Sequence, residues 1–147
     1  MTISYLTHDL NEPVFKPVKN QMNKVLKKYS SAEHLMYKDP DGSIELLRTF
    51  SENITSAIIR LERKELSNLE SYKDKIEALR EHAIIDTYTY EVLNRFRIIG
   101  NIEKHAHYSP KYDIYEEMAK AQRLTSWFVS RYTHKIIIAV YLPPLAS

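Results

Sequence analysis

Residues 88–108 read YTYEVLNRFRIIGNIEKHAHY, and this stretch decides how the rest of the chain is interpreted. At about 100° per residue, its polar side chains fall in one narrow stripe of a helix. Its apolar side chains gather on roughly the opposite side, as expected of a helix with one face on a core. The stripe holds Asn94, Arg97, Asn101, His105 and Tyr108, and the apolar face holds Val92, Phe96, Ile99, Ile102 and Ala106. We therefore predict one amphipathic helix whose chemistry lies on the polar stripe.

Composition limits the classes of protein that the chain can belong to. With 147 residues, 44% of them hydrophobic, the chain fits one domain that can bury its own core. The net charge of +2 gives no bulk electrostatic reason to expect nucleic acid or membrane, so any such binding must be local. The absence of cysteine excludes disulfides, thiolate metal sites and a cysteine nucleophile, and it is compatible with the cytoplasm.

Three further features limit the classes of protein and of fold that we expect. The first residues lack the basic and apolar regions of a standard signal sequence, so we expect no export by that route and a cytoplasmic location. The apolar run 136–142 is too short to span a bilayer, so we expect no membrane partner. Gly42 and Gly100 are the only glycines, which argues against hairpin-rich folds and against glycine loops that bind phosphate.

Working outward from 88–108, apolar periodicity and capping residues predict the other helices. Asp39 and Pro40 mark a helix start, and Ser67 with Glu70 matches a capping box. The predicted segments are a helix over 18–29, a short piece over 30–37, a long helix from 40 to about 66, a helix from 67 to about 82, a turn over 84–87, and a last helix from Asp113 to Tyr132. The side chains expected to point inward are Val18, Met22, Val25, Leu26, Ile44, Leu47, Ile54, Ile58, Leu61, Ile76, Leu79, Ile114, Met118, Ala121, Leu124, Phe128 and Tyr132.

The chain ends are expected to lie outside this helical unit. Residues 1–17 lack periodicity and read as an N-terminal arm, and residues 18–132 form the helical domain. The tail 133–147 is rich in β-branched residues and either continues the last helix or packs as an extended segment on the bundle or on a partner. The predicted fold is all-α, an up-and-down bundle of four to five helices.

Three segments carry a resemblance to a known family. They are AEHLMYKDPDGSIELLRTFSENI at 32–54, KDKIEALREHAIID with LNRFRIIGNIEKHAH over 73–107, and the helix that ends in RLTSWFVSRY at 123–132. Together they resemble the HEPN-superfamily helical domain of unknown function, the type also found at the N-terminus of type I restriction endonuclease large subunits. The resemblance implies a HEPN-like bundle that forms a homodimer in a bacterial defence or mobile-element system, with RNA, DNA or a defence-system protein as a possible partner.

Catalytic members of that superfamily are metal-independent ribonucleases with an Arg-x(4–6)-His motif. His105 and Asn101 match the motif, but Gly100 stands where its closest form has the arginine. Arg97 is the nearest upstream arginine on the right face, and seven residues separate it from His105. The match therefore covers the histidine and the asparagine, and the arginine departs from the pattern.

The residues themselves suggest the same chemistry. His105 can act as acid or base near neutral pH, while Arg97 can hold a phosphate through two hydrogen bonds and Asn101 can orient it. Tyr108 can stack on a base, and Lys104 and Arg95 are further candidates for nucleic-acid contacts.

An alternative treats the stripe as structural. In it, Asn101 and His105 bond backbone groups or a partner subunit, and Arg97 pairs with a carboxylate such as Glu45 or Glu52. The lysine cluster KVLKKY at 24–29 can contact phosphates, although such a face is more often simply solvated. The histidines lack ligand spacing, so no metal and no cofactor are expected.

The sequence therefore predicts a dimeric helical interaction or nucleic-acid-binding module that is not catalytic. The alternative function is a metal-independent endoribonuclease of HEPN type that uses His105 as acid or base.

Overall fold

The computed structural model describes the backbone of residues 16–101 and 112–140, with side chains as far as Thr133. All regular elements in these ranges are helices. They are α2 (Lys16–Leu35), α3 (Pro40–Glu62), the short 3-10 helix η3 (Lys64–Asn68), α4 (Tyr72–Glu81), α5 (Thr87–Ile99) and α6 (Ile114–Val140). The prediction of an all-α bundle is confirmed.

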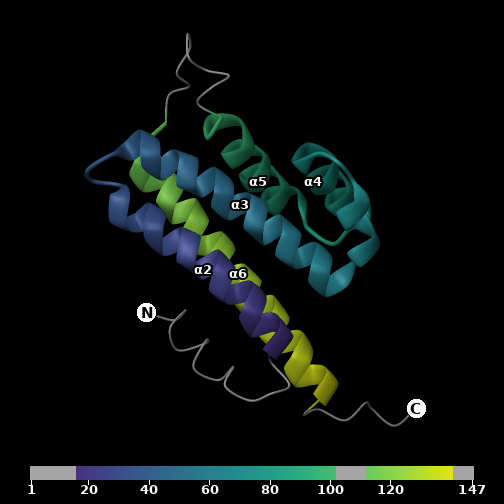
Figure 1. Cartoon of the computed structure of the whole chain (residues 1–147). Helices are drawn as coiled ribbons and strands as arrows, with labels where there is room; N and C mark the ends of the chain where they lie inside the picture. Colours follow the sequence, from purple (N-terminus) through teal and green to yellow (C-terminus); the bar gives the residue numbers. More distant parts are fainter. Residues whose placement is uncertain (1–15, 102–111, 141–147) are drawn as a thin grey trace.

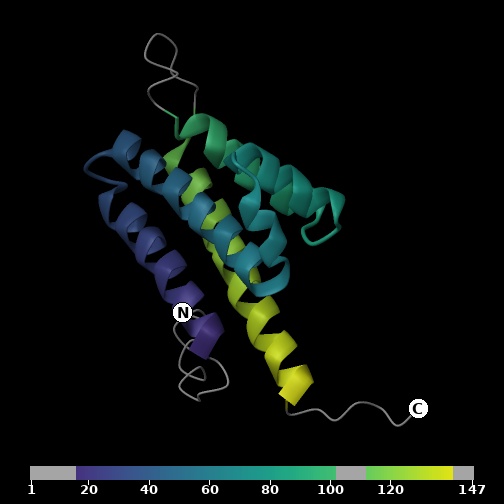
Figure 2. The ribbon, with the colours of Figure 1, turned by 45° about the vertical axis from the view of Figure 1, so that its right-hand side comes forward.

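Helix α3 is the centre of the bundle. It packs against α2, α4, α5 and α6. Figures 1 and 2 show α2, α3 and α6 running side by side, with α2 opposite in direction to the other two. Helices α4 and α5 lie on the side of α3 away from α2 (Figure 1). The end of α2, the start of α3, the end of α5 and the start of α6 therefore meet at one end of the bundle.

The core forms where the apolar faces of these helices meet. Phe50 and Phe96 are fully buried, with ring centroids 6.4 Å apart in an edge-to-face arrangement, and they join α3 to α5. The side chains predicted to point inward are buried, except Leu26 and Leu61, which are half-buried, and Val92 and Ile99 on the predicted apolar face of α5 are also buried. The 3.6-residue periodicity of the sequence therefore identified the core correctly.

Side-chain caps define the start of several helices. The Asp39 side chain accepts a hydrogen bond from the Gly42 amide at 3.0 Å, which confirms the predicted start of α3 at Pro40. Asp86 caps α5 in the same way through the Thr89 amide at 2.7 Å. These contacts satisfy amides that have no acceptor within the first turn.

The predicted boundary between α3 and α4 is wrong. Helix α3 ends at Glu62, and η3 occupies the part predicted to be its last turn and the following cap. Ser67 donates its hydroxyl to the Lys64 carbonyl at 2.6 Å and caps nothing, whereas Ser71 accepts from the Asp74 amide at 3.0 Å and starts α4. The second Ser-x-x-acid pattern, four residues later, was the true signal.

The predicted break after Tyr29 is also wrong, because α2 runs on without interruption to Leu35. Ala32 is completely buried and continues the apolar face of Val25 and Tyr29, so packing favours helix across 30–35. Ser31, a weak helix former, satisfies its hydroxyl on the Lys27 carbonyl at 3.0 Å.

The other two differences concern α5 and α6. The helix predicted over 88–108 ends at Ile99, where Gly100 caps it, and residues 102–111 lie outside the described residues. At the other end of the chain, α6 passes the predicted boundary at Tyr132 and continues to Val140. Of the two alternatives for the tail, continuation of the last helix is therefore the one observed through Val140.

Candidate functional site

The described part of the predicted stripe is an internal hydrogen-bonding seam on α5. Arg97 donates from Nε and Nη2 to the Asn94 side-chain oxygen, at 3.0 and 2.9 Å. Glu45 and Glu52 were the carboxylates predicted to pair with Arg97. Among the described residues Arg97 pairs with neither of them, and Glu52 pairs with Arg48 at 3.3 Å. Asn101 follows the end of the helix and is half-buried. His105, Lys104 and Tyr108 lie outside the described residues, so their predicted roles stay predictions.

Arg95 joins α5 to α6 through a bidentate ion pair. Its Nε and Nη2 donate to the two carboxylate oxygens of Glu117 at 2.7 and 2.9 Å. The Glu117 side chain is 0% exposed, and Lys120 is its second cation at 3.4 Å. The hydrogen bonds that Arg95 donates to Glu117 raise the pKa of Arg95. Two of the donor nitrogens of Arg95 are therefore committed inside the protein.

Gly100 lies where α5 comes closest to α3. A Cβ atom built on it would be 2.4 Å from the Cβ of Arg48, 2.8 Å from the Phe96 carbonyl and 3.0 Å from the Ile44 carbonyl. Two of these neighbours are backbone atoms that cannot turn away. The position at which the closest form of the Arg-x(4–6)-His motif has its arginine therefore has no room for any side chain in this packing.

A small groove follows the outer side of α5. It has a volume of about 240 Å³ and is lined by Glu91, Asn94, Arg95, Ile98 and Ile99. Ile98 is 42% exposed, which is unusual for a large apolar side chain on this fold. The groove is shallow and holds no charged group except Glu91 and the paired Arg95.

The outward face of α2 carries a concentration of positive charge. Helix α2 has five lysines and one glutamate, a net charge of +4, whereas the whole chain has +2. Its buried residues lie on one side, and the lysines lie on the other. We define the α2 face as the outward side chains Lys16, Asn20, Asn23, Lys24, Lys27, Ser30, Ser31 and His34, with Lys19 and Lys28 half-buried at its edges.

Two neighbouring contacts affect the charge of the α2 face. One adds a positive group, and the other engages the single carboxylate of the helix. Arg60 of α3 donates to the Gln21 side chain at 3.5 Å, which places another exposed guanidinium beside α2. The single carboxylate of α2, Glu33, accepts a hydrogen bond from the Tyr29 hydroxyl at 3.2 Å. Burial of the Tyr29 ring, followed by the charge of Glu33, raises the pKa of Tyr29 to about 12, so this hydroxyl stays a donor at physiological pH.

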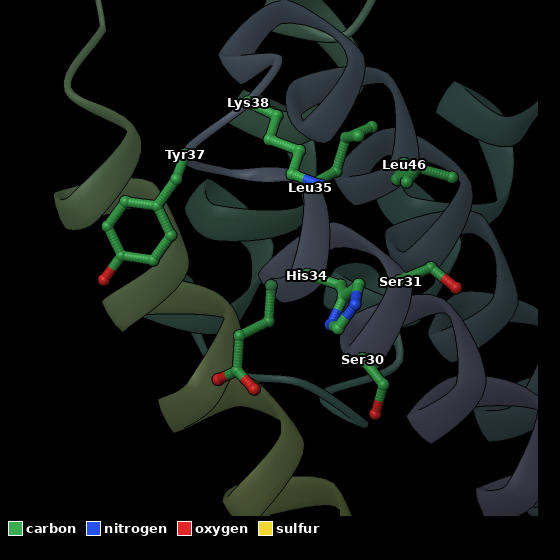
Figure 3. A pocket seen from close by; sticks show the side chains of 8 residues that line it. Ser30, Ser31, His34, Leu35, Tyr37, Lys38 and Leu46 are labelled. Atoms are coloured by element: carbon green, nitrogen blue, oxygen red, sulfur yellow. The ribbon is translucent and has the colours of Figure 1, made fainter.

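An open pocket lies at the C-terminal end of the α2 face. Its volume is about 870 Å³, and it is lined by Ser30, Ser31, Glu33, His34, Leu35, Tyr37, Lys38 and Leu46. Figure 3 shows the imidazole of His34 and the hydroxyl of Ser30 on one side, the ring of Tyr37 on the other, and Lys38 at the upper rim. The pocket is therefore continuous with the α2 face.

An exposed aromatic pair borders this pocket. The rings of Tyr37 and Tyr115 meet edge to face with centroids 5.9 Å apart, and they are 74% and 57% exposed. Tyr112 lies nearby and donates its hydroxyl to Asp41, with burial and that carboxylate raising the pKa of Tyr112. The pair presents aromatic ring surface to solvent.

Sequence reasoning only partly identified these features. The lysines at 24–29 were noted, but a break predicted after Tyr29 separated them from His34 and Tyr37. The uninterrupted apolar face through Ala32 was the signal that joins them. No sequence signal links Tyr37 to Tyr115 or Arg95 to Glu117, because the partners come from distant parts of the chain.

Metal-binding clusters and membrane-spanning helices are both lacking in residues 16–101 and 112–140. There, no three histidine, aspartate or glutamate side chains gather so as to hold a metal ion. None of the helices described is long and apolar enough to cross a bilayer. In comparisons with known proteins, no family model, no curated protein and no solved structure matches the chain.

Proposed function

We propose that this chain is a helical module that binds nucleic acid through the α2 face without cleaving it. The observation that carries the proposal is the charge of α2, a net +4 on a helix whose other side is fully buried. Lysines on one exposed face are suited to phosphates, because each contact releases a condensed counterion from the nucleic acid. Asn20 and Asn23, between the lysines, and Ser30, beyond them, add hydrogen-bond donors for phosphate oxygens.

The surroundings of α5 support binding without cleavage. Phosphate cleavage without metal needs a cation beside the reacting phosphate. Arg95 is engaged by buried Glu117, and Arg97 is engaged by Asn94. Gly100 has no space for the arginine of the ribonuclease motif. These three observations favour structural roles for this part of the helix.

The resemblance to the HEPN superfamily adds proposals of its own. A homodimer, a cytoplasmic location and a role in a bacterial defence or mobile-element system follow from it and from composition, and they stay predictions. Light scattering of the purified chain tests the dimer. Incubation with mixed RNA in EDTA, beside His105→Ala, tests the ribonuclease alternative: cleavage that the variant lacks would replace the present proposal.

Binding is tested by fluorescence anisotropy of labelled RNA over a range of salt concentrations. Replacing Lys24 and Lys27 together with Gln should lower the slope of log K against log salt by about 1.4, roughly 25-fold weaker binding at 0.1 M salt. Lys64→Gln with Lys73→Gln, on η3 and α4, changes total charge equally and should leave binding unchanged. Equal losses in both double variants, or no binding by the native chain, would refute the proposal.

A further inference from the structure

The α2 face ends at the exposed aromatic pair, and the two features are suited to different parts of one ligand. We propose that they form a single track for single-stranded nucleic acid, in which the lysines hold phosphates and an unpaired base stacks on Tyr37. The preference for single strands rests on the proposed nucleic-acid binding and adds to it the class of ligand.

The pocket in Figure 3 connects the two features physically. Ser30, Ser31 and His34 belong to the α2 face and also line the pocket, whose opposite side is the ring of Tyr37. Its volume of about 870 Å³ is within the range of sites that hold small organic groups, so a nucleobase fits. From Lys16 to His34 the helix rises about 27 Å, which gives the lysines several nucleotides of strand to contact.

The distribution of charged side chains along the track suits its two ends to different parts of the ligand. The described carboxylates near the aromatic pair include Glu33, Asp39, Asp41 and Asp113, which accept hydrogen bonds from Tyr29, Gly42, Tyr112 and the Tyr115 amide, respectively. Carboxylates at this end disfavour a phosphate there. An uncharged base suits the aromatic end, and the phosphates suit the lysines toward the N-terminal end of α2.

The exposed ring is what distinguishes a single strand from a duplex. Tyr37 is 74% exposed, and its ring meets that of Tyr115 at an interplanar angle of 61°. Bases in a duplex are already stacked on each other, whereas an unpaired base has a π-face that can stack on tyrosine. A duplex can therefore use only the lysines, while a single strand uses the lysines and the ring.

The experiment compares Tyr37→Leu with the matched variant Tyr37→Phe, which keeps the ring. The probes are a labelled RNA of about 12 nucleotides, the same strand annealed into a duplex, and the same strand with abasic sites. Tyr37→Leu should weaken single-strand binding about tenfold or more, and Tyr37→Phe should leave it unchanged. Neither variant should change binding of the duplex or of the abasic strand. Circular dichroism of both variants checks that this exposed position leaves the fold intact.

The outcomes separate this inference from the proposed function. If the lysine variants lose affinity but Tyr37→Leu binds the single strand like the native chain, the track is wrong and the phosphate-binding face stands. An equal loss on duplex and single strand with Tyr37→Leu would also overturn base stacking. If no probe binds the native chain, both proposals fail.

Discussion

Replacing Arg95 with Met should destabilise the protein more than any other single change at an exposed arginine. Glu117 is 0% exposed and relies on Arg95 for two of its contacts, at 2.7 and 2.9 Å. Removing one partner of a buried ion pair typically costs about 3–5 kcal/mol, because the remaining charge stays out of water. Arg95 is itself 38% exposed and Lys120 remains 3.4 Å from the carboxylate, so we expect a smaller cost of about 2–3 kcal/mol.

Urea denaturation followed by circular dichroism measures this cost directly. In a thermal scan the same loss corresponds to a fall in Tm of about 6–9 °C for a chain of this size. Arg123→Met, at an exposed position of α6, is the matched control and should change the free energy of unfolding by less than about 0.5 kcal/mol. The double variant Arg95→Met with Glu117→Leu should recover most of the loss, since it removes both charges together.

A cost below about 0.5 kcal/mol for Arg95→Met, or no recovery in the double variant, would refute the structural role of this pair. The same variant also tests the predicted nucleic-acid contact of Arg95. If its stability is native and its RNA binding is lost, the guanidinium contacts the ligand rather than holding α5 on α6.

Three further changes test other contacts. Gly100→Ala should destabilise by about 1–3 kcal/mol in urea because its Cβ would meet Arg48 and backbone oxygens, although alanine at an ordinary helix end with φ −80° would otherwise be favourable. Asp86→Ala should cost about 1 kcal/mol at pH 7. The hydrogen bond from a backbone amide holds the pKa of Asp86 below its ordinary value, so this difference should vanish as the pH falls through the carboxyl range, and Asp86→Asn should retain the cap at all pH values. Glu62→Gln should cost about 1 kcal/mol by thermal unfolding, because it weakens the 3.2 Å contact with Arg131, and a native Tm would contradict this.

The fold was largely predictable because the periodicity of buried residues persists through every helix. Core positions such as Ile44, Ile76 and Phe128 recur at helical spacing, and hydrophobic burial alone decides them. Helix boundaries were less predictable. Ser67 and Ser71 both precede an acidic residue by three positions, and only tertiary packing selects the second.

The candidate site was harder to predict for a physical reason. Periodicity reports which residues share a face of one helix, but it does not report which helix that face meets. Arg95 and Arg97 are two residues apart, yet one pairs with α6 and the other with its own helix. The stripe through Arg97 and Asn101 requires a continuous helix, whereas α5 ends at Ile99 with Gly100 as its C-cap.

The central place of α3 has a consequence for how the molecule opens. Because four helices pack on α3, its amide hydrogens can reach solvent only when most of the bundle has come apart, so they should exchange with deuterium at the rate of global unfolding. Helix α4 lies at the periphery and has ten residues, so its amides should exchange through smaller local openings. Slow exchange in α3 and fast exchange in α4 would divide the chain into a late-opening centre and an early-opening edge.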